Sequence, residues 1–127
     1  MNDEQGSVPQ AEDPHSQILA AVSREMVRLY KEQFGRGPTK ARTHYAGPDT
    51  LICTLRDSFT PAERRLAEMG EHQRLRDTRL YFQYATEDEF RGVVEKLTGR
   101  KVFAFISGVD AEKDVSSEIF YLEPETA

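Results

Sequence analysis

Residues 99–122 read GRKVFAFISGVDAEKDVSSEIFYL, and this stretch decides the fold. It contains a Gly-Arg pair, an apolar run over residues 101–107, a Gly-Val-Asp turn signal and a second apolar run over residues 117–122. Val, Ile, Phe and Tyr favour strands, and Gly with Asp favours turns. The stretch therefore predicts two strands that form a hairpin and are apolar on both faces, or nearly so.

The same order of elements occurs earlier in the chain. Residues 18–57 and residues 88–123 each contain a helical segment that ends at Gly-Arg, a strand, a Gly-x-Asp turn and a second strand. The landmarks are Gly35-Arg36 with Gly47-Pro48-Asp49, and Gly99-Arg100 with Gly108-Val109-Asp110. Two helix-strand-strand units joined by middle helices predict an α+β fold with a four-stranded, mainly antiparallel sheet.

In the first copy, an apolar stripe at three- and four-residue intervals predicts an amphipathic helix that Ser16 caps and Gly35 ends. The stripe consists of Ile18, Leu19, Val22, Met26, Leu29, Tyr30 and Phe34. The strand over residues 39–45 alternates, which predicts a half-solvated strand near a sheet edge. Its polar side chains are Lys40, Arg42 and His44. On the return strand, we expect Leu51, Cys53 and Leu55 to face inward.

The middle of the chain carries strong helix signals. Thr60-Pro61-Ala62-Glu63 combines a capping box with proline at the first helical position. Gly70 ends or kinks this helix, and a second helical stretch covers residues 72–85, so one kinked rod and two separate helices both remain open. Thr86-Glu87-Asp88-Glu89 predicts another capping box before the last helix.

Length and composition indicate one globular domain of 127 residues. We expect a flexible acidic tail over residues 1–16, a single domain over residues 17–123 and a short C-terminal tail over residues 124–127. The chain has no apolar run of about 18 residues, and its N-terminus lacks the apolar region of a signal peptide. We therefore expect a cytoplasmic protein without direct membrane insertion. Cys53 is the only cysteine, which excludes an intramolecular disulfide.

The net charge of −5 is unevenly distributed. Residues 1–23 carry four acidic side chains and no Lys or Arg, residues 24–79 carry 12 basic and 8 acidic side chains, and residues 80–127 carry 5 basic and 10 acidic ones. This polarity favours a complementary partner or a second copy of the chain over general nucleic-acid binding, which uses a concentrated basic face.

Strands that are apolar on both faces must be covered on both faces. One layer of helices covers only one face, so we expect a homo-oligomer, with a dimer favoured. We expect its interface to be built in part on the exposed sheet face or on the set of Phe103, Phe105, Phe120 and Leu122. The alternative is that the middle helices cover the second face within one chain.

Two polar segments are candidates for ligand binding. The loop Gly35–Lys40 resembles a phosphate-binding loop, with Arg36 and Lys40 as cations, but it follows a helix, so a helix end with a turn is the alternative. In the second segment, His72 is a candidate general base, and the arginines are candidates to hold an anion or an interface. These arginines are Arg74, Arg76 and Arg79, and a solvated, ion-paired helix face is their structural alternative.

The sequence contains no spacing that is typical of metal ligands, so we expect no metal site and no cofactor. Nucleic-acid binding through Tyr81, Phe82 and Tyr84 is disfavoured, because their spacing is that of a helix core.

Several spaced motifs over residues 17–123 resemble the MpsC-like family of small bacterial proteins. They are Ser23–Val27, Gly35–Arg42, Gly47-Pro48-Asp49, Thr60–Glu63, Gly70, Arg79, Gly99–Val102 and Ser107–Asp110. The resemblance implies a component of a membrane-potential-generating system, linked to sodium translocation or inorganic-carbon uptake, whose other members lie in the membrane. It supplies no catalytic residues.

Two hypotheses follow. We expect a non-enzymatic cytoplasmic accessory or scaffold protein, oligomeric and peripheral to an integral membrane transport partner. The alternative is a small-anion-binding or enzymatic domain that uses the helix with His72, Arg74, Arg76 and Arg79.

Overall fold

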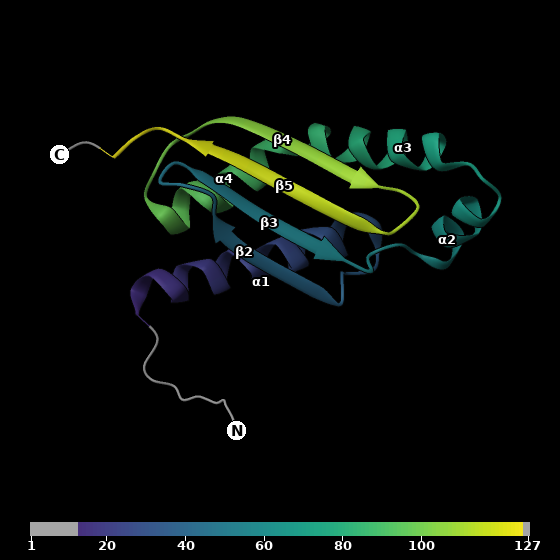
Figure 1. Ribbon diagram of the computed structural model, residues 1–127, viewed down its shortest axis with the longest axis horizontal. Helices are drawn as coiled ribbons and strands as arrows, with labels where there is room; N and C mark the ends of the chain where they lie inside the picture. The colour runs from purple at the N-terminus through teal and green to yellow at the C-terminus, as the bar shows by residue number, and fades with distance from the viewer. Residues whose placement is uncertain (1–12, 126–127) are drawn as a thin grey trace, which may run out of the picture.

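The structure is a computed structural model that describes residues 13–125 (Figure 1). Four helices and four strands follow one another in the predicted order. They are α1 (Pro14–Phe34), β2 (Lys40–Tyr45), β3 (Thr50–Arg56), α2 (Pro61–Glu68), α3 (His72–Ala85), α4 (Glu87–Thr98), β4 (Val102–Asp110) and β5 (Val115–Leu122).

The strands form one sheet in the order β2-β3-β5-β4, and every neighbouring pair is antiparallel. The α+β prediction is therefore confirmed, with the two hairpins joined along β3 and β5. In Figure 1, helices α1 and α4 lie behind the sheet, α3 runs along its β4 edge and α2 lies beyond its end. The opposite face of the sheet has no helix over it within the described residues.

The core lies between the sheet and the helices. Helix α1 contributes Val22, Met26, Leu29 and Tyr30, helix α4 contributes Phe90 and Val94, and the sheet contributes Leu51, Cys53, Leu55, Val102, Phe105, Phe120 and Leu122. The inward positions predicted for the β3 residues and for the α1 stripe are thus confirmed. A smaller cluster of Phe59, Leu75 and Ala111 packs near α2 and α3.

Two predicted helix caps are wrong. Helix α1 begins at Pro14, and the side chain of Asp13, not Ser16, caps it by accepting a hydrogen bond from the Ser16 backbone N–H at 2.7 Å. Thr86 has φ −111° and ψ 24°, not the extended backbone of a capping residue, because α3 runs almost directly into α4. The Thr86 hydroxyl instead donates to Gln33 Oε1 at 2.7 Å.

Two other boundaries also differ from the expectations. The domain starts at the α1 cap rather than at residue 17, and the rest of the predicted N-terminal tail, residues 1–12, lies outside the described residues, as do residues 126–127. The predicted turn Gly108-Val109-Asp110 lies within β4, and the chain reverses over residues 111–114. Helices α2 and α3 are separate, with Gly70 at φ 82° between them.

Candidate binding surface on the open face of the sheet

Arg79, predicted to bind a ligand, lies inside the protein and is only 1% exposed. Its Nη2 atom donates to Glu63 Oε1 at 2.6 Å and to the Ser58 carbonyl at 2.9 Å, and its guanidinium lies 3.7 Å from the centre of the Phe34 ring. All these partners belong to this chain. Arg79 therefore joins α3 to α2 and α1.

Arg36 also contacts the protein itself. Its Nη1 atom donates to the backbone carbonyls of Asp57, at 2.5 Å, and Phe59, at 3.2 Å. The Asp57 carboxylate also pairs with Arg64 and accepts a hydrogen bond from Thr39 at 3.0 Å. The hydrogen bonds from Arg64 and Thr39 are the main reasons that the pKa of Asp57 is below its usual value. Arg36 thus holds the connection between β3 and α2.

The other candidates on α3 do not converge on one point. A His72 ring nitrogen lies 3.0 Å from the Ala67 carbonyl, and Arg74 is 71% exposed and pairs with Glu71 at 3.5 Å. Arg76 donates to Gln73 at 3.1 Å. The sixth candidate, Lys40, lies on β2 on the open face of the sheet. The six residues therefore do not form one site.

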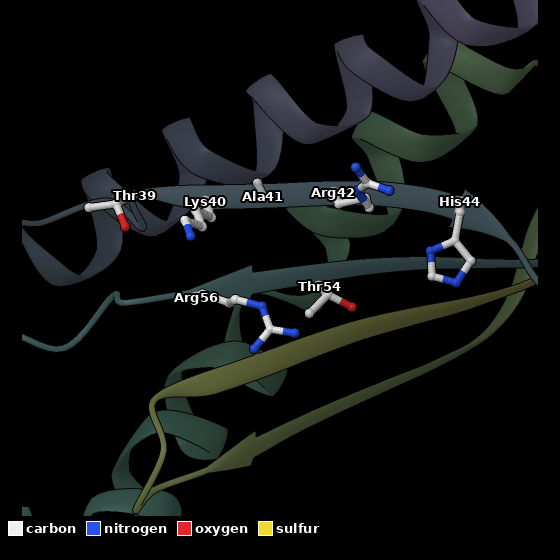
Figure 2. Close-up of a pocket in the computed structure, with 7 residues that line it drawn as sticks. All are labelled: Thr39, Lys40, Ala41, Arg42, His44, Thr54 and Arg56. Carbon is white, nitrogen blue, oxygen red and sulfur yellow. The ribbon is translucent and has the colours of Figure 1, made fainter.

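A groove of about 610 Å³ runs along the open face between β2 and β3 (Figure 2). Strand β2 and the residue before it contribute Thr39, Lys40, Ala41, Arg42 and His44, and β3 contributes Thr54 and Arg56. The cationic residues of β2 occupy alternate positions because successive side chains of a strand point to opposite faces. No carboxylate lines the groove. This part of the surface is therefore basic in a chain with a net charge of −5.

The sheet register places two cations of the groove directly opposite each other. Lys40 pairs with Arg56, and Arg42 pairs with Thr54. Like charges at directly opposite positions destabilise a sheet. Within residues 13–125, no ion pair or side-chain hydrogen bond involves Lys40, Arg42, His44 or Arg56. The fold therefore gathers positive charge here without neutralising it.

Most arginines of the described residues pair with a carboxylate of the chain. Seven lie within 4.0 Å of a carboxylate oxygen, namely Arg28, Arg36, Arg64, Arg74, Arg79, Arg91 and Arg100. Arg42 and Arg56 in the groove do not, and neither do Arg24, Arg65 and Arg76 elsewhere. The groove is the place where two of these unpaired arginines lie together with Lys40.

The other half of the open face is apolar. Phe103 and Ile106 on β4 are 59% and 47% exposed, and the Phe103 ring lies 6.4 Å from that of Tyr121 on β5. Ile52 and Ile119, cross-strand partners on β3 and β5, are partly exposed between the apolar half and the groove. We call Phe103, Ile106, Ile119 and Tyr121 the apolar half.

Three residues of the predicted oligomer interface lie in the core and not on this surface. Phe105, Phe120 and Leu122 are 7%, 0% and 0% exposed. Phe120 and Leu122 are on the inner face of β5, which alternates regularly. In β4, a register shift between Val102 and Ala104 leaves Phe103 as an extra residue. Phe103 and Phe105 consequently lie on opposite faces, although they are two residues apart.

A second polar feature lies on the inner face of the sheet. Glu118 of β5 is fully buried, and its Oε2 atom accepts hydrogen bonds from the Tyr30 hydroxyl and from Gln83 Nε2. Its Oε1 atom has no hydrogen-bond partner. Burial raises the pKa of Glu118 to about 8, although the hydrogen bonds from Tyr30 and Gln83 act to lower it.

Glu118 lines none of the four pockets described on the surface of residues 13–125. Among residues 13–125, no group of three or more His, Cys, Asp or Glu side chains could hold a metal ion. The Glu118 cluster is therefore a feature of the core, and the open face is the better candidate for binding.

The site residues predicted from the sequence do not include Arg42, His44, Arg56 or Glu118. Alternation along residues 39–45 already placed Arg42 and His44 beside Lys40. Arg56 joins them only through the β2–β3 register, which requires knowledge of the pairing. Glu118 is at alternate positions with Phe120 and Leu122, so the three side chains share one face of the strand. This spacing was the sequence pattern that could have predicted its burial.

Within the same described range, no helix combines the length and the hydropathy needed to cross a bilayer. The model of a protein family described as "Na+-translocating membrane potential-generating system (MpsC)" matches residues 15–124. No curated protein and no solved structure matches the chain.

Proposed function

The chain belongs to the MpsC family, and from this membership we propose that it is a non-enzymatic accessory component of a membrane-potential-generating system. In this proposal it is a cytoplasmic, oligomeric protein that lies at the membrane surface and binds an integral membrane partner that transports ions or inorganic carbon. The family match supports the link to the system, because it covers nearly the whole described domain.

The observation that carries an accessory role is the helix-free face of the sheet (Figure 1). Exposed apolar side chains grouped on one surface mark interaction sites. Phe103 and Ile106 are such side chains, and they share this face with the basic groove. A surface with an apolar half and a charged half fits a protein partner, which supplies apolar contacts and charge complementarity together.

The competing proposal of an anion-binding enzyme on α3 has less support. Arg79 is occupied by Glu63, and Arg76 by Gln73, while Arg74 lies exposed on the helix. Catalysis requires groups that converge on a reacting atom. A thermal-shift screen with phosphate, nucleotides and bicarbonate tests this alternative, and ligand-dependent stabilisation that Arg76→Ala abolishes would favour it.

The test of the accessory role is affinity capture from native membranes in mild detergent. The tagged chain is compared with the double variant Phe103→Glu/Ile106→Glu, which adds charge to the apolar half. We expect an integral membrane protein to be recovered with the unmodified chain and lost with the variant.

A matched control for this capture is Arg65→Glu/Arg74→Glu. Both of its positions are exposed on helices away from the open face. This variant should retain the membrane partner, and circular dichroism should show that all three proteins are folded. Recovery of no integral membrane protein by the unmodified chain would contradict the proposal.

A further inference from the structure

We propose that the groove between β2 and β3 binds an extended acidic segment of a partner protein, with carboxylates at alternate positions. The inference rests on the proposed function, because it names the chemistry of the partner that docks on the open face. It begins from the four basic side chains of the groove. These are Lys40, Arg42, His44 and Arg56.

The positive charge of the groove is not balanced by carboxylates of the described residues. Lys40 and Arg56 are direct cross-strand partners, and neither has a carboxylate within 4.0 Å, as the ion pairs of the described residues show. This arrangement costs stability in the free protein. A carboxylate that enters between the two side chains removes the repulsion and adds charge-assisted hydrogen bonds to the guanidinium. The fold is therefore organised to receive negative charge from outside.

The basic side chains of β2 are evenly spaced. Lys40, Arg42 and His44 project from alternate positions of a strand, so neighbouring members of the row are about 6.6 Å apart along it. An extended peptide with Asp or Glu at alternate positions has the same repeat. A single phosphate is too small to contact the whole row. The row therefore fits a polypeptide better than a small anion.

The surface is concave. A bilayer is flat, whereas these side chains line a groove of about 610 Å³. This shape favours an extended chain that lies in the groove.

The test is fluorescence anisotropy with a labelled peptide of sequence Glu-Val-Glu-Thr-Glu-Val-Glu-Thr, in which all four carboxylates share one face of a strand. The control peptide has Gln in place of each Glu. We expect the unmodified chain to bind the acidic peptide at least tenfold more tightly than the control peptide. Binding should weaken as the salt concentration rises, because exposed charges are screened.

The matched protein variants change charge equally at two places. Arg42→Glu/Arg56→Glu reverses two cations of the groove, and Arg65→Glu/Arg74→Glu reverses two exposed cations on helices. We expect the groove variant to lose at least tenfold in affinity for the acidic peptide and the helix variant to change less than threefold. Equal loss in both variants, or no binding by the unmodified chain, would overturn the inference.

Two further arms separate other sources of negative charge. Flotation with phosphatidylcholine vesicles that contain phosphatidylglycerol tests a lipid surface, and competition with inorganic phosphate tests a small anion. Vesicle binding without peptide binding would replace the inference with a lipid site. Loss of peptide binding while membrane capture persists would overturn only this inference. Peptide binding without membrane capture would overturn only the proposed function.

Discussion

Arg79 of α3 and Glu63 of α2 form a bidentate ion pair, in which Nε lies 2.7 Å from Oε2 and Nη2 lies 2.6 Å from Oε1. Glu63 is also the N3 residue of the α2 capping box, and its Oε1 atom accepts from the Thr60 N–H at 2.9 Å. Burial acts to raise the pKa of Glu63, but the hydrogen bonds from Arg79 and Thr60 outweigh it, and the pKa is lowered. The Glu63 carboxylate therefore caps the N-terminus of α2 and also attaches α2 to α3.

Replacement of Arg79 by Met should destabilise the protein strongly. The change leaves Glu63, whose side chain is 15% exposed, without its cation. Removal of one partner of a buried ion pair costs about 3 to 5 kcal/mol, and we expect the lower end because Glu63 keeps some contact with water. Urea denaturation measures the loss. Arg74→Met is the control, since an exposed pair contributes about 0 to 1 kcal/mol. A loss below about 1 kcal/mol for Arg79→Met would contradict this role.

Glu118 should make the stability depend on pH in the opposite sense to an ordinary carboxylate. Its pKa in the folded protein is raised to about 8 from the usual 4.5, so the folded state holds a proton that the unfolded state releases. The contribution of Glu118 to the stability of the protein should therefore be greatest below pH 4.5. It should decrease as the pH rises from 4.5 to about 8. The slope approaches about 1.4 kcal/mol per pH unit for one proton.

The variant Glu118→Gln removes this titration and keeps the size of the side chain. We expect the slope between pH 5 and 8 to flatten and the variant to be more stable than the unmodified chain above pH 8, as measured by urea denaturation across this range. Glu112→Gln, at an exposed position, is the control and should retain the slope. An unchanged slope in Glu118→Gln would show that another group is responsible.

The bulge in β4 makes a sharp prediction about two phenylalanines. Phe105 is 7% exposed and its ring packs against those of Tyr84, Phe90 and Phe120. Phe105→Ala should cost about 3 to 5 kcal/mol. Phe103→Ala should cost less than about 1 kcal/mol, because Phe103 is 59% exposed. Chemical denaturation of both variants measures the difference. Similar losses would mean that the two rings share one face.

The architecture was predictable because each local signal agreed with the global fold. The Gly35 end of α1, the capping box at Thr60 and the alternation of β2 each specify one element. The bulge at Phe103 was not predictable from the sequence. Aromatic side chains suit either face of β4, so the residues of this strand are compatible with a regular register and with a bulged one. The bulge explains why Phe105 lies in the core and not on the predicted interface. Phe120 and Leu122 lie in the core because β5 alternates regularly, with Glu118, Phe120 and Leu122 on its inner face.

The face of α3 shows why Arg79 was assigned to a surface. The buried residues of this helix are Leu75, Arg79 and Gln83, at four-residue intervals, whereas Tyr81, Phe82 and Tyr84 are 71%, 42% and 42% exposed. Hydrophobic periodicity selects the aromatic residues as the core face. Arg79 and Gln83 are buried instead because Glu63 and Glu118, far away in the sequence, supply their partners.

In the isolated protein, without a membrane partner, the apolar half of the open face should mediate self-association. The chain has a mass of 14.5 kDa, so sedimentation equilibrium at micromolar concentration should give about twice this value for a dimer. Phe103→Glu/Ile106→Glu places two carboxylates where both side chains are about half exposed, and burial of unpaired charge opposes association. This variant should sediment as a monomer, while the helix variant Arg65→Glu/Arg74→Glu should remain associated. A monomer for the unmodified chain would leave the face to a different protein, and association that survives in the double variant would place the contact elsewhere.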